Sequence, residues 1–259
     1  MSKHSITAEL LSSNPSAFQK ATQSNFLKSA ALGKTPKDVL GTWLANDRLY
    51  IHSYIKAIGR LLTVLDLPQQ VPEPADCDPA SIKLLDWIVA SMVNIRREEK
   101  FFIDVARKFG IEVSLKARGG GKVEDADKLE GLRRYEGLFG SLEAGPEILP
   151  WLEGAVLFYA TEKCYLDAWT WSKAQLVEQE ASLDADGGAL RTEFINNWTC
   201  DEFVQFVKDL GDIIDQGVEE QVAIHGEAIK KDLFERAVKV WSAVLSAEEA
   251  FWPDMPANF

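Results

Sequence analysis

Apolar residues recur every three or four positions along most of the chain, which is the spacing of amphipathic helices. The clearest run predicts a helix that begins at Thr35 and ends near Pro68, with one face buried. A hydroxyl at the cap, Pro36 at the first helical position and the acidic Asp38 in the first turn together favour a helix start there. We therefore expect a long helix early in the chain.

The same spacing continues through the rest of the chain, with breaks at residues 71–79 and 184–188. Only residues 111–115 are a candidate for a short strand. The sequence therefore predicts an all-α bundle of seven or more helices, which forms a single domain over residues 1–259. The further helices are expected at about residues 80–109, 129–142, 149–174, 190–210, 213–225 and 228–251.

Residues 110–127 contain no periodic apolar pattern, and Gly119, Gly120 and Gly121 lie in their middle. We expect a mobile surface loop at about residues 116–128. A phosphate-binding loop of the form GxxxxGK[ST] is excluded, because Lys116 stands where its first glycine should be and Val123 follows the lysine. The role of the glycines stays open. The proline-containing tail, residues 253–259, is expected to be irregular.

Composition and charge narrow the class of protein. Against 28 Lys and Arg stand 40 Asp and Glu, so the net charge is −12, which excludes a general nucleic-acid binder and disfavours anionic membranes as partners. The first 13 residues do not resemble a signal peptide, and nowhere do 18 apolar residues run together. We therefore expect a soluble, cytoplasmic protein. Its three cysteines (Cys77, Cys164 and Cys200) form no CxxC pair and are expected to be reduced.

Histidine and serine chemistry find little support in the sequence. None of His4, His52 and His225 follows a glutamate at the three-residue spacing of di-iron helices. There is no G-x-S-x-G nucleophile motif. We therefore expect no metal and no cofactor.

Three carboxylates, Asp47, Glu162 and Glu248, lie in register with apolar residues on predicted helices and should point inward. A buried carboxylate is costly unless it is paired or functional. Each is therefore either a structural acid with a polar partner or part of a polar pocket for a flat heteroaromatic ligand. The aromatic residues expected around them are Tyr50, Tyr54, Tyr135, Tyr159, Trp198 and Trp252.

Four segments in order resemble motifs of the TenA/thiaminase II family, the thiamine-salvage branch of the haem-oxygenase-like helical bundles. Residues 43–50 (WLANDRLY) resemble an apolar pair followed by Q-D-x-x-Y, and residues 194–203 (FINNWTCDEF) resemble W-I-x-x-Y-S-S-E-E-F. Residues 248–252 (EEAFW) match E-x-x-F-W, whereas residues 155–159 (AVLFY) share only the last residue of C-x-W-x-Y. The resemblance implies a haem-oxygenase-like fold and a homo-oligomer.

The resemblance also implies roles for individual residues. Asp47 would bind an aminopyrimidine, with Tyr50 as a contact beside it. Glu248 would be the catalytic acid and base, and Tyr159 and Tyr135 would complete the polar network of the pocket.

Two positions depart from the family pattern. Ala155 stands where the resemblance places a nucleophilic cysteine, so thiolate attack from that position is absent. Cys164 does not replace it, because nine residues put it on the opposite face of the helix. Trp198 replaces a pocket tyrosine. The chain resembles the TenA-like class that lacks the cysteine, and Glu162 is our candidate for the missing polar group.

Two functions follow from this pattern. The first is a hydrolase that removes an amine or amide from an aminopyrimidine by carboxylate acid/base catalysis, which the presence of Asp47 and Glu248 favours. The second is a catalytically silent protein that binds a pyrimidine or related heterocycle, which Ala155 favours. An unrelated activity of such bundles, such as a cofactor-independent oxidase, is a third reading.

Overall fold

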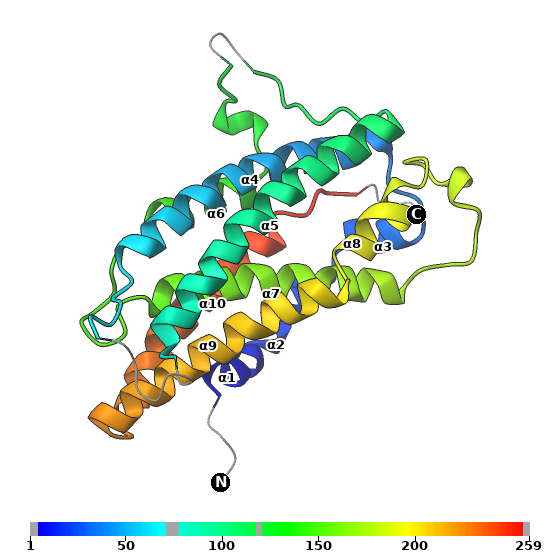
Figure 1. The fold of residues 1–259 in the computed structure, drawn as a ribbon. Coiled ribbons are helices and arrows are strands. Elements are labelled where there is room, and N and C mark those ends of the chain that lie inside the picture. Colours follow the sequence, from blue (N-terminus) through cyan, green and yellow to red (C-terminus); the bar gives the residue numbers. More distant parts are fainter. Residues whose placement is uncertain (1–4, 71–77, 118–120, 256–259) are drawn as a thin grey trace.

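The computed structural model describes residues 5–70, 78–117 and 121–255, and within them the regular structure is helical (Figure 1). Short 3-10 helices lie at Asp125–Asp127 and Ala181–Leu183, and a π-helix lies at Leu190–Phe194. The α-helices are α1 (Ile6–Ser13), α2 (Pro15–Thr22), α3 (Asn25–Ala31), α4 (Lys37–Thr63), α5 (Ala80–Phe109), α6 (Glu130–Gly140), α7 (Leu152–Ala174), α8 (Ile195–Asn197), α9 (Asp201–His225) and α10 (Ile229–Glu249).

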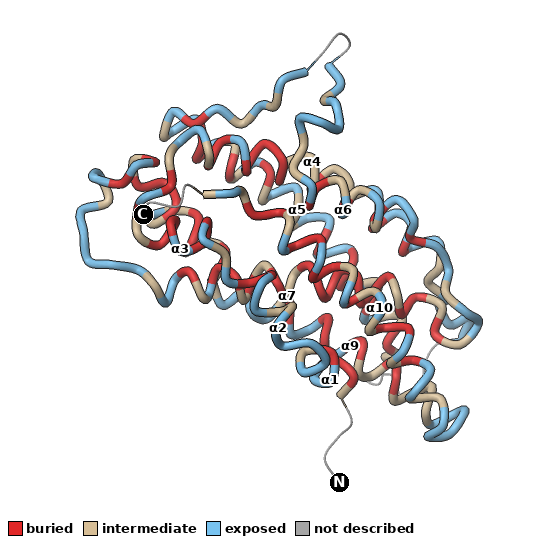
Figure 2. Tube along the Cα trace, turned by 180° about the vertical axis from the view of Figure 1, so that it is seen from behind, coloured by how far each residue is buried: buried red, intermediate tan, exposed pale blue. Residues whose placement is uncertain are grey.

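Helix α7 lies at the centre of the bundle, and its buried residues are distributed around most of its circumference. It packs against α10, α9, α2 and α3, while α4 packs against α5 and α6 on the other side (Figures 1 and 2). A helix that is apolar all round needs neighbours on every side, which explains why the short α2 and α3 cover it. One apolar core joins residues from α1 through α10.

The predicted helix over residues 80–109 is confirmed as α5, which ends in a left-handed Gly110. The start of α4 is not as predicted. Pro36 is its N-cap, and the Thr35 hydroxyl donates to Ser29 Oγ at 3.1 Å instead of capping the helix. Helix α4 ends at Thr63, before the predicted end.

The predicted boundaries between residues 190 and 225 are wrong. The chain breaks after Asn197 and is then one continuous helix, α9, from Asp201 to His225. Gly211 lies within α9 and packs against the ring of Tyr159, which lies 3.1 Å from where a Cβ on Gly211 would be.

Residues 111–115 do not form the expected strand. In the described part of the chain the β-type pairing is a single bridge between Ala117 and Val123. The backbone there packs on α4 instead, with the Glu112 carbonyl 2.2 Å from where a Cβ on Gly41 would be. Gly119 and Gly120 lie outside the described residues, so the mobile loop expected at about residues 116–128 stays a prediction.

No helix in the described ranges combines the length and hydropathy needed to cross a membrane.

Candidate functional site

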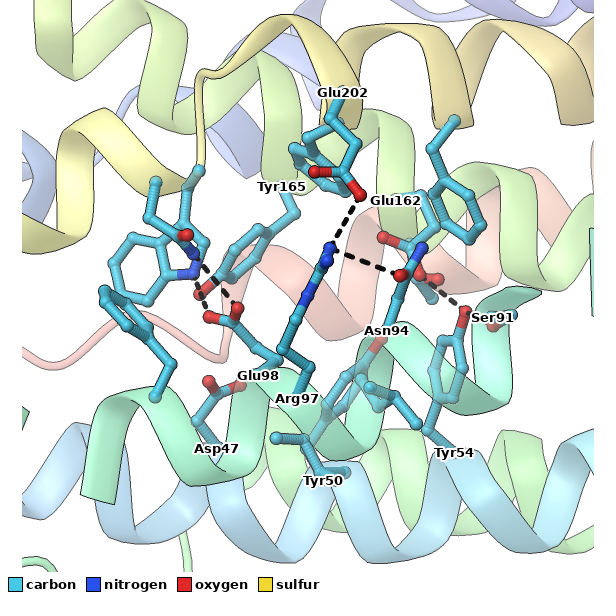
Figure 3. Close-up of a pocket in the computed structure, with 18 of the residues that line it drawn as sticks. Asp47, Tyr50, Tyr54, Ser91, Asn94, Arg97, Glu98, Glu162, Tyr165 and Glu202 are labelled. Carbon is cyan, nitrogen blue, oxygen red and sulfur yellow. Dashed lines mark hydrogen bonds and ion pairs between the residues drawn. The ribbon is translucent and has the colours of Figure 1, made fainter. Parts of the chain in front are cut away.

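A cavity of about 400 Å³ lies between α4, α5, α7, α9 and the segment after α8 (Figure 3). That volume suits a small organic molecule. Carboxyl groups, aromatic rings and neutral polar groups alternate around it. Its polar and aromatic lining residues are Asp47, Tyr50, Tyr54, Ser91, Asn94, Arg97, Glu98, Phe101, Thr161, Glu162, Tyr165, Asn197, Trp198, Cys200, Glu202, Phe203 and Phe206.

Asp47 lies on the cavity side of α4, as its register predicted, and is only 5% exposed. No hydrogen bond joins its carboxyl group to another of the described residues. Burial raises its pKa well above the usual value, and the nearby Glu98, Glu248 and Glu162 raise it further. An unpaired carboxyl group of this kind is costly, and a ligand that donates hydrogen bonds to it would remove that cost.

Glu162 reaches the same cavity from α7. The Tyr54 hydroxyl donates to its Oε1 at 2.5 Å and lies 2.9 Å from Ser91 Oγ, so the Ser91 hydroxyl donates to the Tyr54 oxygen. Burial raises the pKa of Glu162 to about 7, although the Tyr54 hydrogen bond opposes the rise. Glu162 can therefore both accept and release a proton near neutral pH.

Glu98 on α5 lines the cavity beside Asp47, and the sequence analysis did not identify it. It accepts hydrogen bonds from Asn197 Nδ2 at 3.0 Å and from Trp198 Nε1. Burial raises its pKa, while these two donors oppose the rise. A signal was present, because Glu98 follows the buried Ser91 by seven residues. The surrounding run of charged residues hid it.

Glu248 and Tyr135 lie one layer behind the cavity wall instead of lining it. The Tyr135 hydroxyl donates to Glu248 Oε2, and Glu248 Oε1 has no hydrogen-bond partner among the described residues. Tyr50 separates the pair from the cavity, with its ring 4.9 Å from that of Tyr135. Burial raises the pKa of Glu248 to about 8, and Glu162 adds to the rise. The prediction that Glu248 points inward is confirmed.

The rim of the cavity carries an ion pair between α5 and α9. Arg97 Nη2 donates to Glu202 Oε1 at 2.8 Å and to Asn94 Oδ1 at 3.3 Å (Figure 3). Both charged side chains are mostly exposed. Arg97 is the one cationic side chain among the described residues that line the cavity, so the site is strongly acidic. No cluster of three or more potential metal ligands occurs in the described ranges.

Comparison with known proteins gives one relative by sequence. No family model matches the chain. A protein of Fusarium pseudograminearum named "Probable transcription factor" is 23% identical over 271 residues, which are 93% of this chain and 51% of the relative. The chain thus spans about half the length of that curated relative.

Comparison with solved structures finds chains of similar fold over nearly the whole length of this chain. A TenA homologue from Pyrococcus furiosus has a TM-score of 0.68 and 23% identity over 95% of this chain and 98% of its own. A TenA family transcription regulator from Silicibacter sp. TM1040 has a TM-score of 0.69 and 13% identity, with 96% of each chain covered. A TenA homologue from P. horikoshii OT3 has a TM-score of 0.65 and 14% identity over 96% and 97%.

The chain has the TenA fold. The predicted all-α, haem-oxygenase-like bundle is therefore confirmed. At these identities the likeness establishes the architecture, and the chemistry of the cavity has to be argued from its own residues.

The residues of α7 that the resemblance singled out, Ala155 and Tyr159, do not line the main cavity. Ala155 is fully buried and does not line the cavity, and Tyr159 stacks on Trp241 at 6.2 Å beside a second hollow of about 280 Å³. Thr161 and Tyr165, six residues further along with the same four-residue spacing, line the main cavity. Six residues turn a helix by about 240°, so the two pairs of residues lie on different faces of α7.

Trp198 lies where the TenA resemblance placed it, in the cavity wall. Its indole packs on Trp169 at 4.5 Å and on Phe194 at 4.9 Å. The π-helix Leu190–Phe194 comes directly before α8 and Trp198, and such bulges often occur beside functional sites. Of the predicted site residues, the cavity therefore brings together Asp47, Tyr50, Glu162 and Trp198.

Proposed function

We propose that the chain is a TenA-type hydrolase of thiamine salvage, which removes an amine or amide from an aminopyrimidine by carboxylate acid/base chemistry. The proposal is carried by two carboxyl groups in one aromatic-walled cavity. Asp47 is buried without a hydrogen-bond partner among the described residues, and Glu162 has a pKa raised to about 7. One carboxyl group is suited to hold the ring and the other to move protons.

Asp47 suits the edge of an aminopyrimidine. A ring nitrogen and an adjacent exocyclic amine present an acceptor and a donor side by side, and a carboxyl group that carries one proton matches both. The raised pKa of Asp47 means that it can keep this proton at higher pH than an ordinary aspartate. Tyr50, Tyr165 and Trp198 would cover the faces of the ring, because flat aromatic surfaces favour stacking.

Glu162 is the best placed group for the reaction itself. It would take a proton from an attacking water and return it to the departing amine, which is the cycle a base with a pKa near 7 performs well. Tyr54 fixes its orientation through the hydrogen bond to Oε1. Glu248 would act from behind Tyr50, where its high pKa keeps it protonated and Tyr135 connects it to the wall. Ala155 offers no nucleophile, so this mechanism contains no covalent step from that position.

The test is incubation of the purified protein with 4-amino-5-aminomethyl-2-methylpyrimidine, its N-formyl derivative and thiamine. Product is followed by mass, and ligand occupancy by thermal shift in the same samples. We expect product from one pyrimidine, loss of turnover with retained occupancy in Glu162→Gln, and loss of occupancy in Asp47→Asn. Tyr159→Phe is the matched control, because Tyr159 lies outside the cavity. Equal turnover in wild type and Glu162→Gln would contradict the mechanism.

A ligand-binding role without turnover is the second candidate. Thr161 supports it, since the Thr161 hydroxyl donates to the Phe158 carbonyl at 2.8 Å and so has its only proton engaged. The names of the Fusarium and Silicibacter relatives refer to transcription, which fits a sensor as well as an enzyme. A thermal shift without product would select this function. A cytoplasmic location stays a prediction from the sequence, and a homo-oligomer stays a prediction from the resemblance.

A further inference from the structure

One cysteine opens into the acidic cavity. Cys200 is partly exposed and lines the cavity beside Glu202. Cys164 is completely buried, and burial raises the pKa of its thiol well above the usual value. Cys77 lies outside the described residues. Among the described thiols, Cys200 is the one that a small molecule inside the cavity meets.

Cys200 lies at the start of a helix and near a cation. It is the N-cap residue of α9, a helix of 25 residues, where free backbone N–H groups and the helix dipole stabilise negative charge. Arg97 lies close by. The pKa of Arg97 is raised mainly by its hydrogen bond to Glu202, with Glu98 and Cys200 adding smaller contributions. A thiolate is the nucleophilic form of cysteine.

A second, independent observation indicates that a ligand reaches this thiol. Asp47 is 5% exposed, has no hydrogen bond to another described residue, and faces the same cavity. The cavity also contains Glu98 and Glu162, while its one described cation, Arg97, is already paired with Glu202. The net field inside therefore favours a molecule that carries an amine.

We propose that Cys200 is a covalent modification site that closes the cavity by thiol–disulfide exchange with a small, amine-bearing disulfide. The Cys200 sulfur attacks one sulfur of the disulfide, a new S–S bond forms, the old one breaks, and the departing thiolate takes up the proton that Cys200 released. The bound half places its ammonium group toward the carboxyl groups and fills the ligand space. A reducing thiol reverses the step. This inference does not depend on which ligand the cavity binds.

The test uses the full chain and cystamine, with 3,3′-dithiodipropionic acid as the anionic counterpart. We expect one cysteamine adduct, located on Cys200 by peptide mass mapping, and a faster reaction with cystamine than with the dianion by roughly 3- to 10-fold at low salt, decreasing as salt is added. Cys164→Ala should keep the adduct. Cys200→Ser should lose it while its circular dichroism stays that of the wild type.

Asp47→Asn and Glu162→Gln provide the decisive comparison. Both should reduce the preference for cystamine over the dianion without abolishing the adduct, because each removes a carboxyl group that can carry negative charge and leaves the thiol. Modified wild type should also lose the thermal shift caused by any cavity ligand and regain it after reduction. An adduct on Cys77 or Cys164 instead, or equal rates for the two disulfides, would overturn the proposal. Failure of every pyrimidine to react would leave the mapping result unaffected.

Discussion

At the residue scale, the sequence predicted which way some of the carboxyl groups near the cavity point, but not how deep they lie or which groups they contact. Helical register placed Asp47 and Glu248 on inward faces, and both are buried. Register gives the direction of a side chain but not its depth, so Glu248 was expected in the wall and lies behind Tyr50. Glu98 was missed because charged neighbours obscured its spacing. The partners of each acid come from other helices, which a local pattern does not reveal.

Ionisation of Glu162 should control the pH dependence of the reaction. If it is the general base, kcat/KM for the reactive pyrimidine should rise as pH passes through about 7, the pKa of Glu162, because only the ionised form accepts a proton. Glu162→Gln should lower kcat by roughly 10²- to 10⁴-fold. Tyr54→Phe removes a hydrogen bond that lowers the pKa of Glu162, so the rise should move to higher pH. An unchanged profile in Tyr54→Phe would show that Glu162 does not control it.

At the element scale, the long helices were predictable where their ends carry local signals. Pro79 precedes α5 and the left-handed Gly110 follows it, and its bounds were predicted correctly. The short α1, α2 and α3 were not predicted, because seven or eight residues are too few to show a period. Their N-cap residues Ser5, Asn14 and Ser24 were the available signal. The break predicted between residues 210 and 213 is absent, since Gly211 lies within α9 and packs against the Tyr159 ring.

Close packing of α6 on the end of α10 sets the position of Tyr135 against Glu248. A Cβ on Gly131 would lie 2.3 Å from the Phe251 backbone nitrogen, whereas one on Gly137 would meet nothing within 4 Å. We expect Gly131→Ala to lower the free energy of unfolding by about 1–3 kcal/mol. The control Gly137→Ala, on the same helix, should raise it by up to about 1 kcal/mol. Urea unfolding measures both, and a similar loss in both variants would contradict the packing argument.

Arg236 on α10 contacts both the first turn of α7 and the segment that precedes α7. It donates to both oxygens of Glu153 at 2.7 Å, and to the carbonyls of Ile148 and Leu149 at 2.7 and 3.0 Å. Leu149 has a φ of 55°, which is strained for a non-glycine residue. Arg236→Met should therefore destabilise the protein by roughly 3–5 kcal/mol, because Glu153 loses its partner. Recovery of most of the loss in Arg236→Met with Glu153→Leu would show that the unpaired charge is the cause.

At the scale of the whole molecule, the helical bundle encloses several buried carboxyl groups whose pKa values are raised. One apolar core connects α1 to α10, and on that ground we propose that residues 1–259 are a single domain. Asp47, Glu98, Glu162 and Glu248 all have raised pKa values for the same first reason, burial. The packing of the helices in the described residues thus creates a cavity that holds acids partly protonated. That property could not be derived from composition or net charge.

The pH dependence of stability follows from these raised pKa values. Below the ordinary glutamate pKa of about 4.5, Glu248 is protonated in both the folded and the unfolded state. As pH rises, the unfolded chain releases this proton first, so the folded state loses stability until pH passes about 8, the folded pKa. Stability of the wild type should therefore fall between these two values, and part of the fall belongs to Glu248.

Glu248→Gln should remove that part, because the amide never ionises. Relative to wild type, its Tm should increase steadily from pH 5 to pH 8.5, by roughly 2–4 °C for each 1 kcal/mol of relief in a chain of this size. Glu249→Gln is the matched control. Glu249 is the next residue along the chain, its side chain is half exposed, and its Oε1 lies 3.9 Å from Lys20 Nζ at the surface. Thermal unfolding by circular dichroism across this range decides the matter. Parallel curves for wild type and Glu248→Gln would mean that Glu248 ionises as easily in the folded protein as in the unfolded chain.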